Sequence, residues 1–326
     1  MNIAINGLGR IGRLVLKIAL ERGLNIVAVN DLVDTKTLAY LLKYDSVYGI
    51  YNKKVETGKD FIKINNKKIE VFSEQDPEKL PWKNLKINYV VEATGIFRDR
   101  VGSEKHLKAG AKKVIISAPC KEPDITIVLG VNEQKLNKNH KIISMASCTT
   151  NCLAPLAKVL EDKFKIKKAF MTTIHAYTTS QKILDLPDKK LRRGRAAAIN
   201  IIPTTTGATS ATSEVIPSLK NKINGLAFRV PVACGSVVDL VAELGKKVKK
   251  EQINQALKQV ASGKLKGIIQ YTEDEIVSSD IIKNTHSCII DGLSTQVIGN
   301  TVKVVAWYDN EYGYSCRMVE LLKRLR

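Results

Sequence analysis

Cysteine is scarce in this 326-residue sequence: six occur, and their positions follow no regular spacing. A disulfide-stapled secreted domain needs such a framework, so reduced thiols in a cytoplasmic protein are the better interpretation. No apolar run approaches the roughly 20 residues that cross a bilayer, so no membrane partner is expected. The first residues already have a strand pattern and lack the basic and then apolar regions of a secretory signal, so no signal peptide is expected.

Acidic residues are few relative to basic ones: 32 Asp and Glu stand against 52 Lys and Arg, for a formal net charge of +20. Such a balance is typical of proteins that bind nucleic acid or other polyanions. The lysines, however, lie in short clusters and form no long tail, which favours a general surface bias. The chain also lacks the interleaved aromatics of RNA-binding sheets. Nucleic-acid binding is retained only as a side-activity hypothesis.

Histidine is equally scarce, with four in the chain. Cys148 and Cys152 lie one helical turn apart, and a pair of this kind could hold a metal ion. No second Cys or His pair of zinc-finger spacing accompanies them. No metal site is therefore predicted.

The first part of the chain alternates strand and helix patterns. Apolar runs at 2–6 and 25–30 flank a glycine turn and a helical pattern at 10–22, an order that predicts a βαβ unit. Residues 54–72 suggest short antiparallel strands, and about 101–110 suggest a helix. Further β-branched runs lie at 88–93, 113–117, 125–129 and 141–145. Together these patterns predict a Rossmann-like, doubly wound parallel α/β domain.

The second part has longer strand patterns. A helical pattern runs from about 149 to 164, and two others cover 208–219 and 250–262. Residues 178–202 lack periodicity and are rich in Lys and Arg, and such a long loop in a compact domain is usually functional. Strand-like runs lie at 167–176, 224–233, 236–244, 288–291 and 301–308. These patterns predict an α+β domain with a large mixed or antiparallel sheet.

The patterns change character near residue 147, so two domains are predicted, 1–147 and 148–310. The chain then ends in an amphipathic helical pattern at 315–326. This C-terminal helix, taken as about 311–326, is expected to pack back on the first domain. The sequence contains no internal repeat, low-complexity segment or flexible linker.

The segment from Gly7 to Gly12 fits the pattern G-x-G-x-x-G, follows a strand and opens a helix. Gly7 allows the tight turn, Gly9 lets the backbone approach a pyrophosphate at the helix N-terminus, and Gly12 permits close helix–strand packing. Asp31 follows about 20 residues later, where its carboxylate can bond ribose hydroxyls and repel a 2′-phosphate. The sequence therefore predicts NAD rather than NADP. The alternative is a glycine turn with an incidental aspartate.

Cys148 lies where an apolar run ends and a helical pattern begins. The dipole at a helix N-terminus favours the thiolate, which is the reactive form, and Thr149 and Thr150 are suited to capping and to anion binding. His175 ends another apolar run, and a cysteine nucleophile needs a histidine as its base. The alternatives are a buried structural thiol and a satisfied core histidine. Spacing alone does not show that His175 approaches Cys148.

The chain resembles the glyceraldehyde-3-phosphate dehydrogenase family along essentially its whole length. The motifs that carry the resemblance, in family order, are N-G-L-G-R-I-G-R (6–13), A-S-C-T-T-N-C (146–152), H-A-Y-T (175–178), D-L-P (185–187), L-R-R-G-R-A-A-A (191–198), I-I-P-T-T-T-G-A (201–208), R-V-P (229–231), S-V-V-D-L (236–240) and W-Y-D-N-E-Y-G-Y-S (307–315).

The resemblance implies a catalytic role for two residues and a binding role for two anion sites. Cys148 resembles the nucleophile and His175 the general base. Thr178 and Arg229 resemble the site for the phosphate of the substrate. The residues that resemble the inorganic-phosphate pocket are Ser147, Thr149, Arg193, Thr206 and Gly207.

Cofactor contacts are implied in the same way. Asn310 resembles the residue that holds the nicotinamide carboxamide, with Tyr314 beside the ring. Leu186 and Pro187 resemble the NAD-preferring variant of the family and agree with Asp31. The further contacts that the resemblance implies, beside the glycines of the turn, are Arg10, Ile11, Asp31, Thr94 and Ser117.

The reaction that the resemblance implies is the oxidation and phosphorylation of D-glyceraldehyde 3-phosphate to 1,3-bisphosphoglycerate in glycolysis or gluconeogenesis. It uses NAD⁺ and inorganic phosphate and passes through a thioester on Cys148. The alternative is the sister enzyme erythrose-4-phosphate dehydrogenase, and the intact T-T-T-G at 204–207 favours the glycolytic reaction. The family is homotetrameric, so a tetramer is expected, with the loop 178–202 near the cofactor site of a neighbour.

Two stretches depart from the family pattern. Thr179-Ser180 stands where the family often has Asn-Asp, which predicts a more positive substrate-phosphate region that still binds. Val232-Ala233-Cys234-Gly235 replaces the usual polar stretch after R-V-P and puts local packing in doubt rather than chemistry. The remaining cysteines are interpreted as structural thiols.

Overall fold

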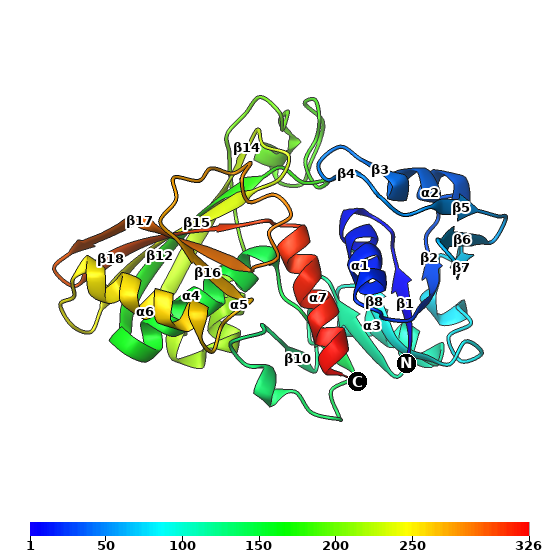
Figure 1. The fold of residues 1–326 in the computed structure, drawn as a ribbon, viewed down its shortest axis with the longest axis horizontal. Helices are drawn as coiled ribbons and strands as arrows, with labels where there is room; N and C mark the ends of the chain where they lie inside the picture. Colours follow the sequence, from blue (N-terminus) through cyan, green and yellow to red (C-terminus); the bar gives the residue numbers. More distant parts are fainter. Residues whose placement is uncertain (326) are drawn as a thin grey trace. The chain divides into compact units, whose positions relative to one another are not determined.

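A computed structural model describes residues 1–325 of the chain, which forms two compact units (Figure 1). The first unit contains Met1–Ile127, Gln134–Ala146 and the chain from Ser315 onward. The second contains Val128–Glu133 and Ser147–Tyr314. The short excursion at 128–133 is not visible as a pattern in the sequence.

The first unit is built on a nine-stranded sheet in the order β10-β11-β9-β8-β1-β2-β7-β6-β5. Neighbouring strands are parallel from β10 to β7, and β6 and β5 add an antiparallel edge. The strands are β1 (Asn2–Asn6), β2 (Ile26–Asn30), β5 (Val55–Thr57), β6 (Phe61–Ile64), β7 (Lys67–Phe72), β8 (Ile87–Glu92), β9 (Lys113–Ile116), β10 (Ile125–Thr126) and β11 (Ile142–Ser144). A separate small hairpin pairs β3 (Tyr44–Asp45) with β4 (Gly49–Ile50).

Helices α1 (Arg10–Glu21) and α3 (Arg100–Lys108) make the crossovers from β1 to β2 and from β8 to β9. These crossovers run in opposite directions from the β1–β8 centre, and right-handed connections then place the two helices on opposite faces of the sheet. This arrangement confirms the predicted doubly wound fold. The unit also contains α2 (Thr35–Lys43), most of α7 (Tyr312–Arg324), the 3₁₀ turn η1 (Pro77–Lys79) and most of the 3₁₀ turn η2 (Glu133–Lys135). Along α7, Glu320 pairs with Arg22 at 3.1 Å.

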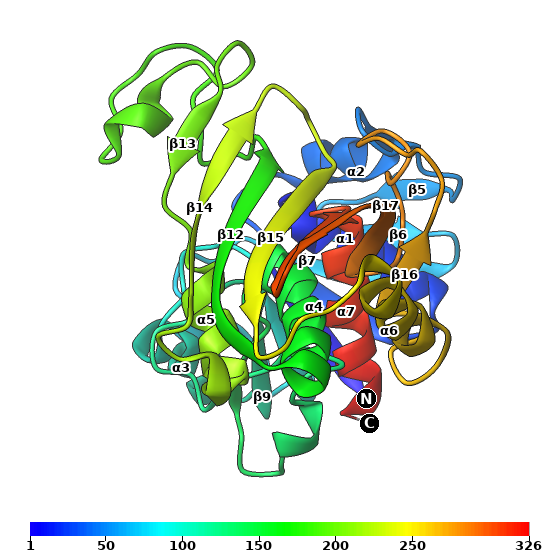
Figure 2. The ribbon, with the colours of Figure 1, turned by 90° about the vertical axis from the view of Figure 1, so that its left-hand side faces the viewer.

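The second unit contains a seven-stranded mixed sheet in the order β13-β14-β12-β15-β18-β17-β16. Its strands are β12 (Ile166–Ala176), β13 (Ile202–Thr204), β14 (Ile223–Val230), β15 (Ser236–Leu244), β16 (Ile269–Thr272), β17 (Cys288–Ile298) and β18 (Thr301–Tyr308). Helices α4 (Cys148–Phe164), α5 (Ala208–Val215) and α6 (Lys250–Ser262) pack on one face of this sheet (Figures 1 and 2). This unit confirms the predicted large mixed sheet. It also holds the 3₁₀ turns η3 (Leu191–Gly194) and η4 (Pro217–Leu219).

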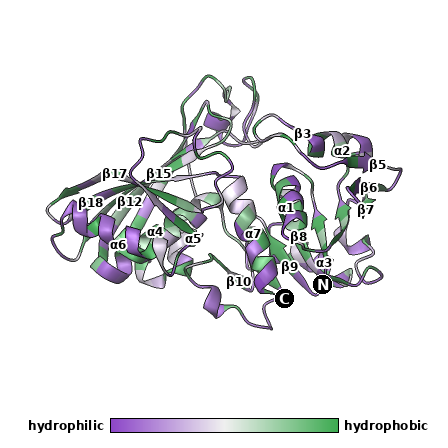
Figure 3. Cartoon of the chain, viewed as in Figure 1, coloured by the Kyte–Doolittle hydropathy of each residue, from purple (hydrophilic) through white to green (hydrophobic). Residues whose placement is uncertain are grey.

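Side-chain alternation explains how the second sheet is buried. Along β12, Ala169, Met171 and Thr173 are buried, whereas Phe170 between them is 68% exposed. Successive residues of a strand point to opposite faces, so the buried set meets the helices and Phe170 points away from them. In Figure 3, strands of this sheet such as β17 and β18 carry hydrophobic residues, coloured green, while α6 also carries hydrophilic residues, coloured purple. His175 lies on the helix-facing set of β12 and is only 4% exposed.

Several elements end earlier than the sequence pattern predicts. The helix predicted at 208–219 ends at Val215 and gives way to η4, because Pro217 cannot continue it. The strand predicted at 224–233 ends at Val230, because Pro231 has no N–H for the ladder. The strand predicted at 125–129 pairs only over Ile125–Thr126, because the chain then leaves the first unit. Helix α7 begins earlier than residue 315, at Tyr312.

Candidate active site

The glycine turn of the first unit is shaped by close backbone contacts. Gly7 has φ +91°, and a Cβ there would lie 2.8 Å from the backbone nitrogen of Thr94. A Cβ on Gly12 would lie 1.9 Å from the carbonyl oxygen of Gly7, so α1 can approach the turn only with glycine at this position. A Cβ on Gly9 would meet nothing within 4 Å, and Gly9 caps the N-terminus of α1. The turn therefore presents open backbone at a helix start, where an anion is favoured.

A cavity of about 490 Å³ lies at the carboxyl ends of β1, β2 and β8. Parallel α/β sheets bind their ligands at this edge, where the strand order reverses. Gly7, Gly9, Asp31 and Thr94, which are predicted cofactor contacts, line it. Asp31 is half-buried, and its Oδ2 accepts a bond of 2.7 Å from the backbone N–H of Leu8. This bond fixes the carboxylate beside the glycine turn, which suits recognition of ribose hydroxyls.

Other predicted cofactor contacts of the first unit lie beside this cavity but do not line it. Arg10 pairs with Asp45 at 2.8 Å, and its guanidinium lies over the ring of Tyr48. Ile11 is in the first turn of α1, directly after Arg10. Ser117 follows β9, and its N–H donates to the carbonyl of Glu92 at 2.9 Å. The structure therefore places these side chains around the same strand ends.

In the second unit, Cys148 is the first residue of α4. Ser147 caps the helix, because its Oγ accepts a bond of 3.1 Å from the N–H of Thr150. Cys148 is half-buried, and Sγ lies 3.4 Å from Nε2 of His175 at the end of β12. The contact that spacing alone could not show is therefore present.

Nδ1 of His175 lies beside one acceptor and one donor. It is 2.7 Å from the carbonyl oxygen of Ala176, which can only accept, and next to the guanidinium of Arg229, which can only donate. When the proton is on Nδ1, a bare Nε2 faces the thiol of Cys148. Nη1 of Arg229 is 2.9 Å from the same carbonyl and 2.9 Å from Nδ1. The arginine charge beside the ring disfavours the imidazolium form.

Burial has the largest effect on the pKa values of Cys148 and His175. Burial, together with the charges of Arg229 and Arg193, lowers the pKa of His175 to about 3, although its bond to Ala176 acts the other way. Burial raises the pKa of the Cys148 thiol above its usual value, although Arg229 and the N–H groups of Cys148 and Thr149 lower it. Burial therefore outweighs the helix-start effect that the sequence predicts, and the resting pair is a neutral thiol and a neutral imidazole.

A cationic and hydroxyl-rich patch adjoins the pair. Nη1 of Arg229 lies 3.5 Å from Oγ1 of Thr178, which itself lies 2.9 Å from Oγ of Ser180. Nε of Arg229 is buried and has no hydrogen-bond partner in the described part of the chain. A guanidinium with spare donors beside a threonine hydroxyl is suited to a phosphate group.

The second predicted anion pocket brings together the end of the long loop and the start of α5. Nε of Arg193 donates to Oγ1 of Thr204 at 2.9 Å, next to Thr206 and Gly207 along the chain. Gly207 precedes the first residue of α5, and Oγ1 of Thr206 accepts from the N–H of Ala208 at 3.1 Å. The charge of Arg193 acts on both His175 and Arg229, so this pocket lies close to the reactive pair.

Asn310 lies after β18 and is 5% exposed. Its Oδ1 accepts from the N–H of Gly235 at 3.1 Å and from Oγ of Ser236 at 2.9 Å, and Sγ of Cys234 is 3.8 Å away. These bonds fix the amide with Nδ2 left as its donor, which suits a carboxamide ligand. Gly235 of the departing stretch therefore orients Asn310 together with Ser236.

The other predicted cofactor residues of the second unit differ in exposure. Tyr314 is 4% exposed, and burial raises its pKa well above the usual range. Leu186 is 58% exposed on the long loop, followed by the exposed Pro187. The N–H of Leu186 donates to the carbonyl of Gly194 at 2.9 Å, which closes this part of the loop on itself.

One residue of the site was missed by sequence reasoning. The phenol oxygen of Tyr308 lies 2.9 Å from Oγ1 of Thr149 and 2.8 Å from Oγ1 of Thr173, and its ring meets that of His175 edge-on. Its signal is present in the W-Y-D-N motif, where β18 ends, but alternation marks it only as a core residue.

Replacing Arg229 with glutamine is expected to move the pH dependence of Cys148 alkylation to higher pH. The arginine charge lowers the pKa of both Cys148 and His175, so its loss raises both and the thiolate forms later. Iodoacetamide labelling should be followed in a Cys120→Ser background, since Cys120 and Cys148 are the two free cysteines that are not buried. Arg195→Gln, an exposed arginine paired with Asp185, is the matched control. An unchanged or lower midpoint for Arg229→Gln would contradict the assignment.

Comparison with known proteins agrees with this geometry. Residues 1–100 match the family described as glyceraldehyde 3-phosphate dehydrogenase, NAD binding domain, and residues 147–310 match its C-terminal domain. Glyceraldehyde-3-phosphate dehydrogenase of Borreliella burgdorferi is 56% identical, over 100% of this chain and 99% of its own length. Glyceraldehyde-3-phosphate dehydrogenase 1 of Bacillus subtilis is 56% identical (98% and 97%), and the Thermotoga maritima enzyme is 54% identical (99% and 98%).

Two further observations concern membranes and metals. Within residues 1–325, no helix combines the length and the apolar character that a membrane crossing requires. The same residues contain no group of three or more His, Cys, Asp or Glu side chains placed to hold a metal ion.

The matches to both family domains and the full-length identities show that the chain is an NAD-dependent oxidoreductase of the glyceraldehyde-3-phosphate dehydrogenase family.

Proposed function

We propose that this protein oxidises and phosphorylates D-glyceraldehyde 3-phosphate to 1,3-bisphosphoglycerate, with NAD⁺ and inorganic phosphate as co-substrates, in glycolysis and gluconeogenesis. The observation that carries the proposal is the Cys148–His175 pair, 3.4 Å apart and flanked by two cationic pockets. A nucleophile with one anion site would suit many aldehyde dehydrogenases. Two anion sites suit a phosphorylated substrate and a phosphate co-substrate.

The first step is attack of the Cys148 sulfur on the aldehyde carbon. Nε2 of His175 accepts the thiol proton as the C–S bond forms, and the carbonyl oxygen then takes this proton to give a hemithioacetal. The developing oxyanion is stabilised by the backbone N–H of Cys148 at the start of α4 and by His175. This step requires a neutral His175 with its proton on Nδ1 and a bare Nε2.

The second step makes the thioester. NAD⁺, when bound, would supply the hydride acceptor. Gly7, Gly9 and Asp31 would hold its dinucleotide, and the amide of Asn310 is suited to its carboxamide. His175 accepts the hydroxyl proton of the hemithioacetal, which leaves a thioester on Cys148 and an imidazolium. Inorganic phosphate, held by Arg193 and the neighbouring hydroxyls, then attacks the thioester carbon. The sulfur departs, His175 returns a proton to it, and the acyl phosphate is released.

We also infer a homotetramer in the cytoplasm. The face of the second sheet that the helices leave uncovered carries exposed apolar side chains on three neighbouring strands, Phe170, Leu226 and Val241. The long loop adds Ile183 and Leu191, each 84% exposed. Apolar surface of this kind is typical of subunit contacts. The six free cysteines suit a reducing compartment. Sedimentation should give four times the mass of one chain.

The function is tested by NADH formation from NAD⁺ and glyceraldehyde 3-phosphate, with and without inorganic phosphate. Turnover that requires phosphate is expected. Turnover that is indifferent to phosphate would indicate a hydrolysing aldehyde dehydrogenase. A preference for erythrose 4-phosphate would instead indicate the sister enzyme.

Restoring an acidic residue at position 180 tests the substrate-phosphate site. Ser180 is exposed and bonds to Thr178, next to Arg229. In Ser180→Asp, we expect the KM for glyceraldehyde 3-phosphate or for phosphate to rise about two- to five-fold, because the new negative charge repels the phosphate group. The rise should be smaller at high salt, which screens this repulsion. Ser218→Asp adds the same charge at another exposed position and is the control. No change in either dependence would remove Ser180 from the site.

A further inference from the structure

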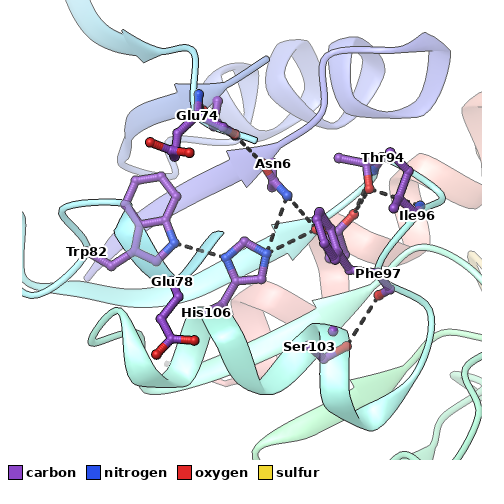
Figure 4. Close-up of polar contacts among 12 residues, drawn as sticks. Asn6, Glu74, Glu78, Trp82, Thr94, Ile96, Phe97, Ser103 and His106 are labelled. Atoms are coloured by element: carbon purple, nitrogen blue, oxygen red, sulfur yellow. Dashed lines mark hydrogen bonds and ion pairs between the residues drawn. The ribbon is translucent and has the colours of Figure 1, made fainter. Parts of the chain in front are cut away.

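A buried polar cluster lies beneath the cofactor cavity of the first unit, and the proposed reaction makes no use of it (Figure 4). Its centre is Glu92, the last residue of β8, which is 1% exposed. Asn6, Trp82 and His106 surround it and are also buried, each at most 1% exposed. A carboxylate removed from water is costly unless hydrogen bonds compensate, so the bonds that Glu92 accepts are informative.

The bonds define the state of each group. The indole N–H of Trp82 can only donate, and it lies 3.0 Å from Nδ1 of His106, so Nδ1 is bare. The proton of His106 is therefore on Nε2, 3.1 Å from Oε2 of Glu92. Oε2 also accepts from Nδ2 of Asn6 at 2.6 Å. His106 therefore donates to the carboxylate through Nε2.

The second oxygen of Glu92 holds Thr94. Oε1 accepts from the backbone N–H of Thr94 at 2.8 Å and from its hydroxyl. The hydroxyl oxygen in turn accepts from the N–H of Ile96 at 3.0 Å. Four donors therefore converge on the two oxygens of one carboxylate, and an amide at this position would set an N–H₂ group against two of them.

The same bonds lead into the cavity wall. Asn6 and Thr94 both line the cofactor cavity. Oδ1 of Asn6 accepts from Nδ2 of Asn30 at 2.7 Å, and Asn30 also bonds to the backbone of Glu74, so the chain of bonds crosses from β8 through β1 and β2 to the far wall. Phe97, another wall residue, packs edge-on against the ring of His106. A ligand that meets a wall already fixed by bonds loses less free energy to ordering.

We propose that Glu92 is a positioning residue for the adenosine half of NAD: its carboxylate, oriented by His106 and Trp82, holds Thr94 and Asn6 in the conformation that binds the dinucleotide. The inference rests on NAD binding by the first unit and goes beyond the direct contacts of the site. Glu92 touches neither the cavity nor the reactive pair, so it acts on cofactor affinity and leaves the chemical step unchanged.

Glu92→Gln tests the proposal, with ADP-ribose as the probe because it lacks the nicotinamide. Two of the four bonds are lost, so we expect the Kd for ADP-ribose and the KM for NAD⁺ to rise about ten-fold or more. The kcat at saturating NAD⁺ and the KM for glyceraldehyde 3-phosphate should stay near those of the wild type. A double-mutant cycle with Thr94→Val should be non-additive in Kd, because Glu92 acts through Thr94.

Glu161→Gln is the matched control. Glu161 is also buried, at 6% exposed, and its Oε2 accepts from the N–H of Ile166 at 2.8 Å in the second unit. Equal affinity for ADP-ribose in the wild type and in both glutamine variants, despite lower thermal stability, would overturn the proposal and leave a purely structural role. Failure of the wild type to bind ADP-ribose would instead contradict NAD binding itself.

A milder variant covers the outcome that Glu92→Gln does not fold. Trp82→Phe keeps an aromatic ring at this position, removes the bond to Nδ1 of His106, and leaves a cavity where the larger indole packed. We expect this variant to fold and to raise the Kd for ADP-ribose about two- to five-fold. A change of this size corresponds to the loss of one hydrogen bond. Wild-type affinity in Trp82→Phe would overturn the part of the proposal that assigns orientation to His106 and Trp82.

Discussion

Cys148→Ser is expected to lower phosphate-dependent NADH formation by about 10⁴-fold or more, with little loss of stability. A serine hydroxyl at this position ionises far less readily than a thiol, and it cannot form the thioester that phosphate cleaves. The substitution replaces one polarizable sulfur with oxygen at a half-buried helix start, and the cap from Ser147 to Thr150 does not involve it. Loss of turnover should therefore occur without loss of the fold.

The control for this variant is Cys120→Ser, since Cys120 is the other cysteine that is not buried. It should retain wild-type turnover. Binding of NAD⁺ should persist in Cys148→Ser, because the cofactor cavity belongs to the first unit. Turnover of Cys148→Ser within ten-fold of the wild type would exclude Cys148 as the nucleophile, whatever its distance from His175.

The cofactor turn could be predicted because it is local in sequence. Its glycines, strand and helix all lie within about thirty residues, and each glycine answers a steric demand that can be stated beforehand. The structure adds the neighbour that the sequence does not reveal. Gly7 is confined by the backbone of Thr94, which follows a strand more than eighty residues later.

The catalytic geometry could not be derived from local patterns. His175 on β12 and Arg229 on β14 are paired residues of two parallel strands, and the segment between them contains the long loop and α5. No periodicity in either strand specifies this register. The resemblance to a known family named both residues, whereas their contact required the fold.

Two short elements, α2 and β16, were not predicted from the sequence pattern. Helix α2 begins after Asp34, whose carboxylate accepts from the N–H of Thr37, and it buries Leu38 and Leu42 at helical spacing. Strand β16 has only four residues, Ile269–Thr272, too few for a clear alternation. The proline-terminated ends of α5 and β14 could likewise have been read from Pro217 and Pro231.

His175→Asn is expected to lower kcat by about 10² to 10⁴-fold, because it removes the group that moves both protons of the reaction. No neighbouring group replaces it. The phenol of Tyr308 is buried, which raises its pKa well above the usual range, and Arg229 carries no lone pair to accept a proton. The control is a half-buried histidine of the first unit. His140→Asn should keep the kcat of the wild type.

Comparing the pH dependence of the wild type with that of His175→Asn tests whether His175 acts as a general base or only packs against Cys148. The pKa of His175 is lowered to about 3 in the ligand-free protein, so the imidazole is neutral and able to accept a proton at any pH above about 5. The charge of Arg229 contributes to this lowering of the pKa. A phosphate group bound to Arg229 offsets that charge and therefore raises the pKa of His175. His175 is then a stronger base once substrate is present. His175→Asn should recover part of its rate as pH rises, because hydroxide then generates the thiolate that the imidazole no longer provides. A variant whose rate stays close to that of the wild type at neutral pH would show that His175 only packs against Cys148.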